Sequence, residues 1–212
     1  MFNLSMAILL LTGIFPLSFA IKSYLNSRDS KMLLLFLWFA VRILEAMICF
    51  ILVKIDQMNL FAYRYFSIVL ETILIIGLAQ VSLNSKSKIW FLLYLVPIQV
   101  LFYQGIVGIT PLVEVSRFEI NMYYYAISCI LMLVLIFGNN TEPHFLRLFQ
   151  LLFVYHMVVF FYVANLDFIL PHKDLMGQTY PFFLAITAIF NLSFAYILYK
   201  KRVAFASVKS SK

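Results

Sequence analysis

Four ionisable side chains interrupt the long apolar runs of this sequence, and they are its strongest candidates for chemistry. Arg42 and Glu45 fall within one run, Glu71 within the next, and His156 within a later one. An ionisable group deep inside such a segment is energetically costly, and it usually pairs with another group, relays protons or binds a ligand. Three roles are therefore open: neutralising one another while fixing helix register, coupling to protons or ions, or contacting a ligand directly. Register is the best attested of these roles.

The spacing of these residues places them on one face each of two helices. Trp38, Arg42, Glu45 and Cys49 follow i, i+4, i+7, i+11, and Arg64, Ser67 and Glu71 follow i, i+3, i+7. At about 1.5 Å of rise per residue, Arg42 and Glu71 both lie roughly 16 Å from the outer ends of their segments. A tight loop joins the two segments, so we expect antiparallel neighbours in which Arg42 faces Glu71. Glu45 is then expected to lie between Arg42 and Arg64.

Polar side chains on four later apolar segments recur at a similar depth. They are Gln99 and Tyr103; Asn121, Tyr124, Tyr125 and Ser128; His156; and Thr187 and Asn191. Each alone is expected to form a hydrogen bond between helices, the usual role of a polar side chain in a membrane bundle. Together they predict a pocket between helices. Its candidate binding residues are Arg42, Glu45, Glu71, Gln99, Tyr103, Tyr124, Tyr125, Ser128, His156 and Asn191.

The composition identifies the environment of these few polar residues. The chain is 64% hydrophobic and 12% charged, whereas a soluble domain carries roughly 25% charged residues. A soluble fold of this size would leave large apolar patches in contact with water, where they aggregate or bind a partner. The sequence therefore predicts an all-α integral membrane protein whose first partner is the lipid bilayer.

Seven apolar runs reach the length of about 20 residues that a helix needs to cross the hydrocarbon core. They are about Leu4–Ile21, Met32–Val53, Leu60–Leu83, Ile89–Ile109, Ile120–Phe137, Leu148–Leu166 and Tyr180–Tyr199. Residues 1–202 are thus expected to form a seven-helix transmembrane bundle, and residues 203–212 a short basic tail. The first run also resembles a signal peptide, because Ser18-Phe19-Ala20 mimics a cleavage site. It lacks the preceding basic residues of such a peptide, so we expect it to be retained.

The basic residues predict the orientation of this bundle. Eleven of the sixteen fall on one side: Lys22, Arg28, Lys31, Lys86, Lys88, Arg147, Lys200, Lys201, Arg202, Lys209 and Lys212. Four fall on the other: Lys54, Arg64, Arg117 and Lys173. Because short cytoplasmic loops carry the excess of Lys and Arg, the N-terminus is expected outside and the C-terminus in the cytoplasm of a cell membrane, inner or plasma. The same distribution accounts for the net charge of +7 without a nucleic-acid partner.

Several chemistries lack the residues they would need. The last span has no lysine in its core to hold a retinal, and His144, His156 and His172 show no metal-binding spacing. Cys49 and Cys129 both lie in apolar runs and are expected to be small buried hydrophobic residues. Neither a metal, a cofactor nor a catalytic residue is predicted.

The sequence therefore favours a non-enzymatic receptor, sensor or complex subunit that binds a small ligand or a membrane-protein partner. A small-molecule or ion transporter is the alternative. Dividing the spans as three, one and three aligns Glu71 with Asn191, as transporters built from repeated units would. A lipid-modifying enzyme using Glu71, Glu45 or His156 as acid–base groups ranks last, because no nucleophile accompanies them.

Overall fold

The regular elements of the computed structural model are α-helices throughout the part of the chain that it describes. That part comprises residues 2–54, 60–84, 87, 90, 92–95, 114–138, 143–165 and 173–210, without some side chains near helix ends. The long helices are α1 (Phe2–Ser27), α2 (Ser30–Lys54), α3 (Leu60–Ser82), α5 (Glu114–Phe137), α6 (Pro143–Ala164) and α8 (Lys173–Ser210). The all-helical class predicted from the sequence is confirmed for these residues.

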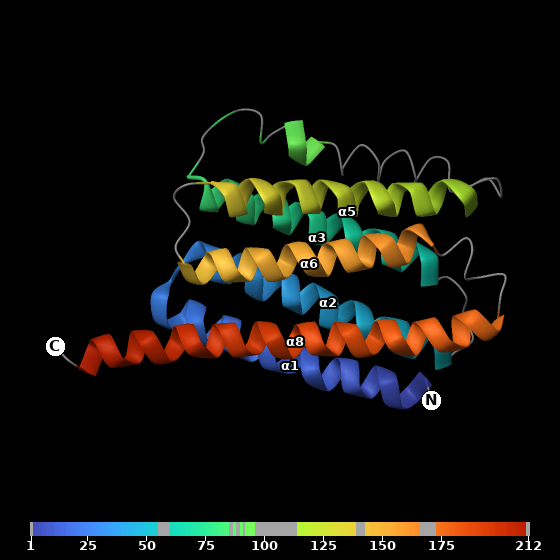
Figure 1. Cartoon of the computed structure of the whole chain (residues 1–212), viewed down its shortest axis with the longest axis horizontal. Helices are drawn as coiled ribbons and strands as arrows, with labels where there is room; N and C mark the ends of the chain where they lie inside the picture. The colour runs from blue at the N-terminus through green and yellow to red at the C-terminus, as the bar shows by residue number, and fades with distance from the viewer. Residues whose placement is uncertain are drawn as a thin grey trace.

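The long helices lie side by side and close into a ring that follows the order of the chain (Figure 1). Each of the pairs α1–α2, α2–α3, α3–α5 and α5–α6 packs directly, and α8 contacts both α6 and α1. The interior of the ring is therefore lined by one face of every long helix. A polar residue on any of these inner faces can meet partners from several helices.

Three helical segments are long and apolar enough to cross a membrane: Ala7–Ser27, Phe145–Ala164 and Pro181–Lys200. Shorter apolar segments occupy Ile68–Ser82 of α3 and Tyr124–Phe137 of α5. Large apolar side chains also cover the outside of the bundle, which is the arrangement expected where lipid is the solvent. The chain therefore has the character of an integral membrane protein.

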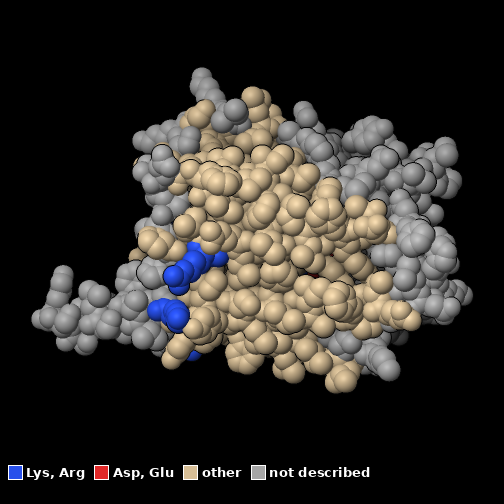
Figure 2. Space-filling view, viewed as in Figure 1, with Lys and Arg blue, Asp and Glu red and all other residues tan. Residues whose placement is uncertain are grey.

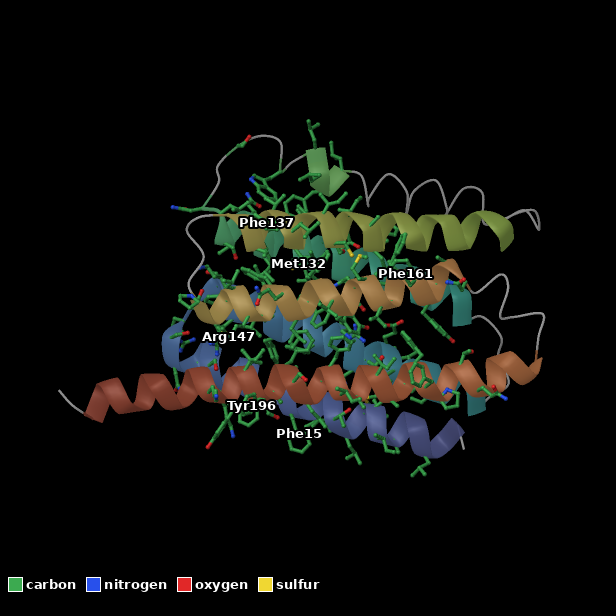
Figure 3. All side chains as sticks on the ribbon, viewed as in Figure 1. Phe15, Met132, Phe137, Arg147, Phe161 and Tyr196 are labelled. Carbon is green, nitrogen blue, oxygen red and sulfur yellow. The ribbon has the colours of Figure 1, made fainter. Side chains whose placement is uncertain are left out.

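Side chains fill the space between the ribbons, and inner and outer residues are clearly divided (Figure 3). Met132 of α5 is fully buried, whereas Phe137 at the end of the same helix is 78% exposed. Phe161 on α6 is also exposed, while Val159 and Val163 on either side of it are buried. This alternation follows the helical period and identifies the face of each helix that turns inward.

The turn between α1 and α2 is fixed by local chemistry. Arg28 ends α1 in the left-handed region, with φ of 53°, a conformation common just after a helix. Asp29 then caps α2, because its Oδ1 accepts a hydrogen bond from the Lys31 N–H at 2.9 Å. The cap satisfies a backbone donor that the first turn of a helix leaves unpaired. It also makes α1 and α2 an antiparallel pair.

The structure refines several boundaries predicted from the sequence. Helices α5 and α6 both begin before the predicted spans, at Glu114 rather than Ile120 and at Pro143 rather than Leu148. Helix α8 runs on through Ser210 because neither glycine nor proline follows Pro181. Residues 203–210 thus continue α8, and a division of the chain at residue 202 stays a prediction.

The fourth predicted span, Ile89–Ile109, lies mostly outside the described residues. Its described beginning packs on the end of α3, where the Tyr94 hydroxyl donates a hydrogen bond to Gln80 Oε1 at 3.1 Å. Asn84, with φ of 49°, ends the preceding helical stretch. Asparagine tolerates this left-handed conformation better than most residues, so a sharp reversal is expected there.

Apart from Arg42, the described basic side chains gather at one end of the bundle. Lys22 and Arg28 lie near the end of α1, Lys31 at the start of α2, Arg147 early in α6, and Lys200 on α8. The Lys31 Nζ lies 4.7 Å from the centroid of the Phe145 ring, which joins the starts of α2 and α6. Figure 2 shows Lys and Arg at this end of the visible face, beside a broad surface without visible charge.

We predict that Asp29→Ala lowers the stability of the protein by about 1 kcal/mol, because it removes the cap of α2. Thermal unfolding of the purified protein in detergent measures the loss. Asp29→Asn is the matched control, since asparagine caps a helix as well as aspartate does. An equal loss in both variants would show that the carboxylate charge, rather than the cap, matters at this position.

Candidate functional site

The candidate site centres on the inward face of α2, where Trp38 and Arg42 are one turn apart. Trp38 is buried, with 2% of its surface exposed, and the Arg42 side chain is 17% exposed. Glu45, one turn further on, is partly exposed. The apolar residues around these positions make α2 helical and turn this stripe toward the ring interior.

Arg42 forms an ion pair with Glu71 of α3, as the matched depths in the sequence predict. The Arg42 Nη1 and Glu71 Oε2 atoms lie 4.0 Å apart, and the Glu71 side chain is only 7% exposed. Direct hydrogen bonds between nitrogen and oxygen usually measure about 2.7–3.2 Å. The contact is thus one of opposite charges rather than a tight two-bond pairing. It neutralises both groups within an apolar interior.

Two aromatic rings complete the surroundings of the Arg42 guanidinium. Its Cζ lies 4.2 Å from the centroid of the Tyr155 ring on α6 and 5.0 Å from that of Trp38. The Trp38 and Tyr155 rings themselves meet edge to face, with centroids 5.9 Å apart. A cation over an aromatic face gains about 0.5–2 kcal/mol, more when water is excluded. Arg42 is therefore stabilised by α2, α3 and α6 together.

Tyr155 was not among the residues predicted from the sequence. The pattern that could have identified it is the spacing of the apolar residues Leu148 and Leu152, which predicts the inward face of α6 and includes position 155. This spacing predicts the contact of Tyr155 with Arg42 only if α6 is known to face α2. This adjacency is a property of the closed ring and is not visible in local sequence.

His156 lies beside the same rings and is 1% exposed. Its Nδ1 is 2.7 Å from the Leu152 carbonyl oxygen, and since a carbonyl only accepts, Nδ1 carries the proton. The imidazole ring lies 5.9 Å from the Trp38 ring and 6.2 Å from the Tyr125 ring of α5. The structure thus brings His156 and Tyr125 together with Arg42, as expected from their depth. We call these two residues, with Arg42, Glu71, Trp38 and Tyr155, the Arg42 group.

Asn191 joins the group from α8 and links that helix to α1. Its Nδ2 donates a hydrogen bond to Thr12 Oγ1 at 3.4 Å. A cavity of about 30 Å³ lies next to it, lined by α1, α2 and α8 and reaching both Arg42 and Asn191. A space of this size holds about one water molecule. The participation of α1 was not expected from the sequence.

Gly13 allows α1 to approach this closely. A Cβ atom at that position would lie 3.1 Å from Ile43 Cγ1 and 3.7 Å from Asn191 Nδ2. Contacts of 3.1 Å between carbon atoms are tighter than the usual 3.5–4.0 Å, so a larger residue would push α1 away from α2. The glycine is therefore part of the wall of the small cavity.

The remaining predicted site residues divide into two groups. Tyr124, Tyr125 and Ser128 are buried on α5, and of these the Tyr125 ring reaches His156. Gln99 and Tyr103 lie outside the described residues, as do the side chains of Arg64 and Cys49. The expected place of Glu45 between two arginines therefore stays a prediction.

One polar atom at the centre of the group has no partner among the described residues. The indole Nε1 of Trp38 is buried and makes no hydrogen bond there. Arg42 presents five N–H donors; the Glu71 carboxylate lies 4.0 Å from it and the Tyr155 side chain is hydrogen-bonded to it. The unpartnered Trp38 donor would suit an acceptor such as a carboxylate, a carbonyl or a water molecule.

The group combines a cation, a carboxylate and aromatic faces. Within the described ranges, His, Cys, Asp and Glu form no group of three or more that would hold a metal ion. Cys129 is buried and free, as expected for a small hydrophobic residue. Comparison of the chain with models of known families, with curated proteins and with solved structures finds no match.

We predict that Arg42→Leu and Glu71→Leu each destabilise the protein more than the two changes made together. An isolated arginine at mid-bilayer costs about 2.5–3.5 kcal/mol on insertion scales, and the double variant leaves neither charge behind. The free energy of unfolding of the four proteins, measured in bilayer mimetics, gives the coupling directly. Arg42→Lys serves as a control that retains the charge and loses the flat stacking surface. Additive single effects would show that the two groups do not interact.

Proposed function

We propose that the protein is a non-enzymatic seven-helix membrane protein, a receptor, sensor or complex subunit. It recognises a small ligand, or an equivalent group of a membrane partner, through Arg42 and its neighbours. The observation that carries this proposal is the unpartnered Trp38 Nε1 next to Arg42, beside an opening that Arg42 and Asn191 line. The part of the ligand that is recognised is therefore a hydrogen-bond acceptor, most simply a carboxylate or a carbonyl oxygen.

The geometry favours recognition over passage of a solute. The opening at Arg42 has a volume of about 30 Å³, whereas pockets for drug-sized ligands measure roughly 300–1,000 Å³. The described conformation is thus closed around the cation. Helices α2, α3, α5, α6 and α8 contribute to the group, so a ligand that changes the contacts of Arg42 shifts these helices relative to one another. This is the behaviour expected of a sensor, whose ligand selects between helix arrangements.

Seven spans fit the directions of the described helices. In Figure 1 α3 and α5 run in the same direction, which supports one further span between them. Tyr94, which follows α3 in the chain, is hydrogen-bonded back to Gln80 of α3. With a span between α3 and α5, every consecutive pair of the seven proposed spans would be antiparallel, as short loops require.

The orientation rests on the basic end of the bundle. Lys22, Arg28, Lys31, Arg147 and Lys200 share that end, and the cytoplasmic side of membrane proteins carries this excess. The C-terminal part of α8 is therefore cytoplasmic and the N-terminus lies outside. The opening to Arg42 then lies within the membrane, between helices that begin and end on opposite sides.

Cysteine labelling checks this topology. In a background without Cys49 and Cys129, we expect an impermeant maleimide added to intact cells to label Asp56→Cys and to leave Ser85→Cys unlabelled. The second position should react only after the membrane is permeabilised. Labelling of Ser85→Cys from outside would reverse the proposed orientation.

Ligand recognition is tested with Trp38 as a built-in reporter. The chain has two tryptophans, so Trp90→Phe leaves Trp38, beside Arg42, as the single fluorophore. We expect at least one of formate, acetate and benzoate to change its emission in lipid nanodiscs and to raise the melting temperature. Arg42→Gln should abolish both effects, whereas Lys31→Gln, a basic residue outside the group, should preserve them.

Two results would contradict the proposed role. Uptake of a responding anion by proteoliposomes, abolished by Arg42→Gln, would identify a transporter. If no anion changes the Trp38 emission or the melting temperature, while the emission still reports unfolding, the role of the Arg42 group is only to fix helix register.

A further inference from the structure

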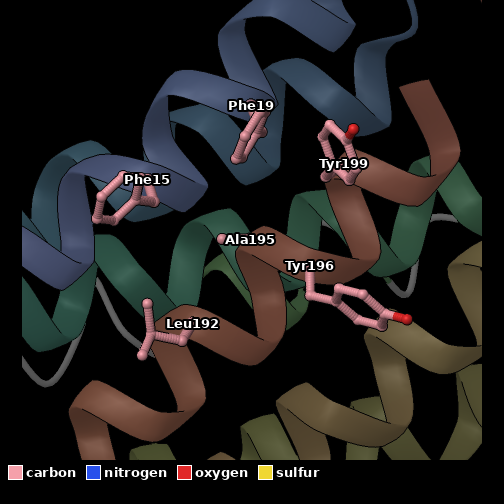
Figure 4. A pocket seen from close by; sticks show the side chains of 6 residues that line it. All are labelled: Phe15, Phe19, Leu192, Ala195, Tyr196 and Tyr199. Atoms are coloured by element: carbon pink, nitrogen blue, oxygen red, sulfur yellow. The ribbon is translucent and has the colours of Figure 1, made fainter. Parts of the chain in front are cut away.

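A groove of about 260 Å³ lies on the outside of the bundle, between α1 and α8 (Figure 4). Its lining residues are Phe15, Phe19, Leu192, Ala195, Tyr196 and Tyr199. The residues on α1 are spaced i, i+4 and those on α8 are spaced i, i+3, i+4, i+7, so each helix contributes one face. Phe15 is 52% exposed and Tyr196 is 58% exposed. The groove therefore opens outward, into the lipid that surrounds the protein.

The walls of the groove are held together near the basic end of the bundle. There the Phe19 and Tyr199 rings meet edge to face, with centroids 5.7 Å apart. The α1–α8 contact is also tied deeper in the membrane by the hydrogen bond from Asn191 to Thr12. The groove is thus a formed feature between two packed helices, rather than a gap between loosely placed ones.

Two lysines lie at the end of the groove where the Phe19 and Tyr199 rings meet. The Lys200 Nζ lies 4.9 Å from the centroid of the Tyr196 ring, which holds the ammonium group against a lining residue. Lys22 follows Phe19 by three residues and extends the same face of α1. Tyrosine and lysine in these positions are typical of the boundary between hydrocarbon and headgroups.

We infer that this groove binds an anionic phospholipid of the cytoplasmic leaflet. One acyl chain lies along the Phe15, Leu192 and Ala195 surface, and the phosphate group faces Lys200 and Lys22. The charges select an anionic headgroup over a zwitterionic one. The site is separate from Arg42 and does not depend on what Arg42 recognises.

Native mass spectrometry tests this inference on the full chain. The protein is released from mixed micelles containing equal amounts of phosphatidylglycerol and phosphatidylcholine, and the retained lipids are counted. We expect the wild type to retain phosphatidylglycerol preferentially. The double variant Lys22→Gln/Lys200→Gln should lower that preference about tenfold, since each cation near an anionic surface contributes a several-fold factor. Ala195→Trp, which fills the groove, should remove the retained lipid of either kind.

Two variants act as matched controls. Arg147→Gln removes a basic residue at the same end of the bundle, and Val154→Trp enlarges an exposed apolar residue of α6; neither should change lipid retention.

Equal retention of the two lipids by the wild type would overturn the inference. So would an equal loss in Arg147→Gln, which would indicate unspecific surface charge. A polypeptide cross-linked to a photoreactive residue at position 196, in protein that retains no lipid, would assign the groove to a partner helix instead. Should Ala195→Trp not fold, the double charge variant decides alone.

Discussion

A guanidinium group cannot remain unaccompanied in an apolar interior, and the inner part of this bundle is organised around that constraint. Arg42 meets the carboxylate of Glu71 on α3 and the flat faces of Trp38 and Tyr155. No single partner satisfies the charge fully, so helices must stay in register for all of them to act together. Closure of the ring by α8 brings Asn191 to the same place and ties it to α1. The cation thereby links helices that are distant in the sequence.

This arrangement connects stability with function. Because the contacts of Arg42 come from several helices, replacing any one of them by a ligand contact changes the balance between helix positions. A ligand shifts a conformational equilibrium only through its different affinity for the two states. Under the proposed function, recognition at Arg42 would be coupled to helix movement, since a ligand larger than water needs the walls of the 30 Å³ cavity to open. The groove between α1 and α8, proposed to bind lipid, lies outside this interior.

The sequence was sufficient for those features that depend on helical spacing and on neighbours in the chain. The pairing of Arg42 with Glu71 follows from equal depth in two segments joined by a short loop. The stacking of Tyr155 on Arg42 and the bond from Asn191 to Thr12 did not follow. They join segments far apart in the chain, and they depend on how the ring closes, which local patterns do not encode. The length of α8 was underestimated because its polar C-terminal residues lack the apolar pattern used to recognise a span.

The distance between the Arg42 and Glu71 side chains in a lipid bilayer tests most directly whether the two charges meet. Solid-state NMR can record dipolar coupling between a guanidinium ¹⁵N of arginine and a carboxyl ¹³C of glutamate, with Arg42→Lys identifying the signal of this pair. The account predicts a resolvable coupling that this variant abolishes, in keeping with the 4.0 Å between Nη1 and Oε2. A spectrum unchanged by Arg42→Lys would show that the two charges do not meet, and it would contradict the arrangement of the bundle around this cation.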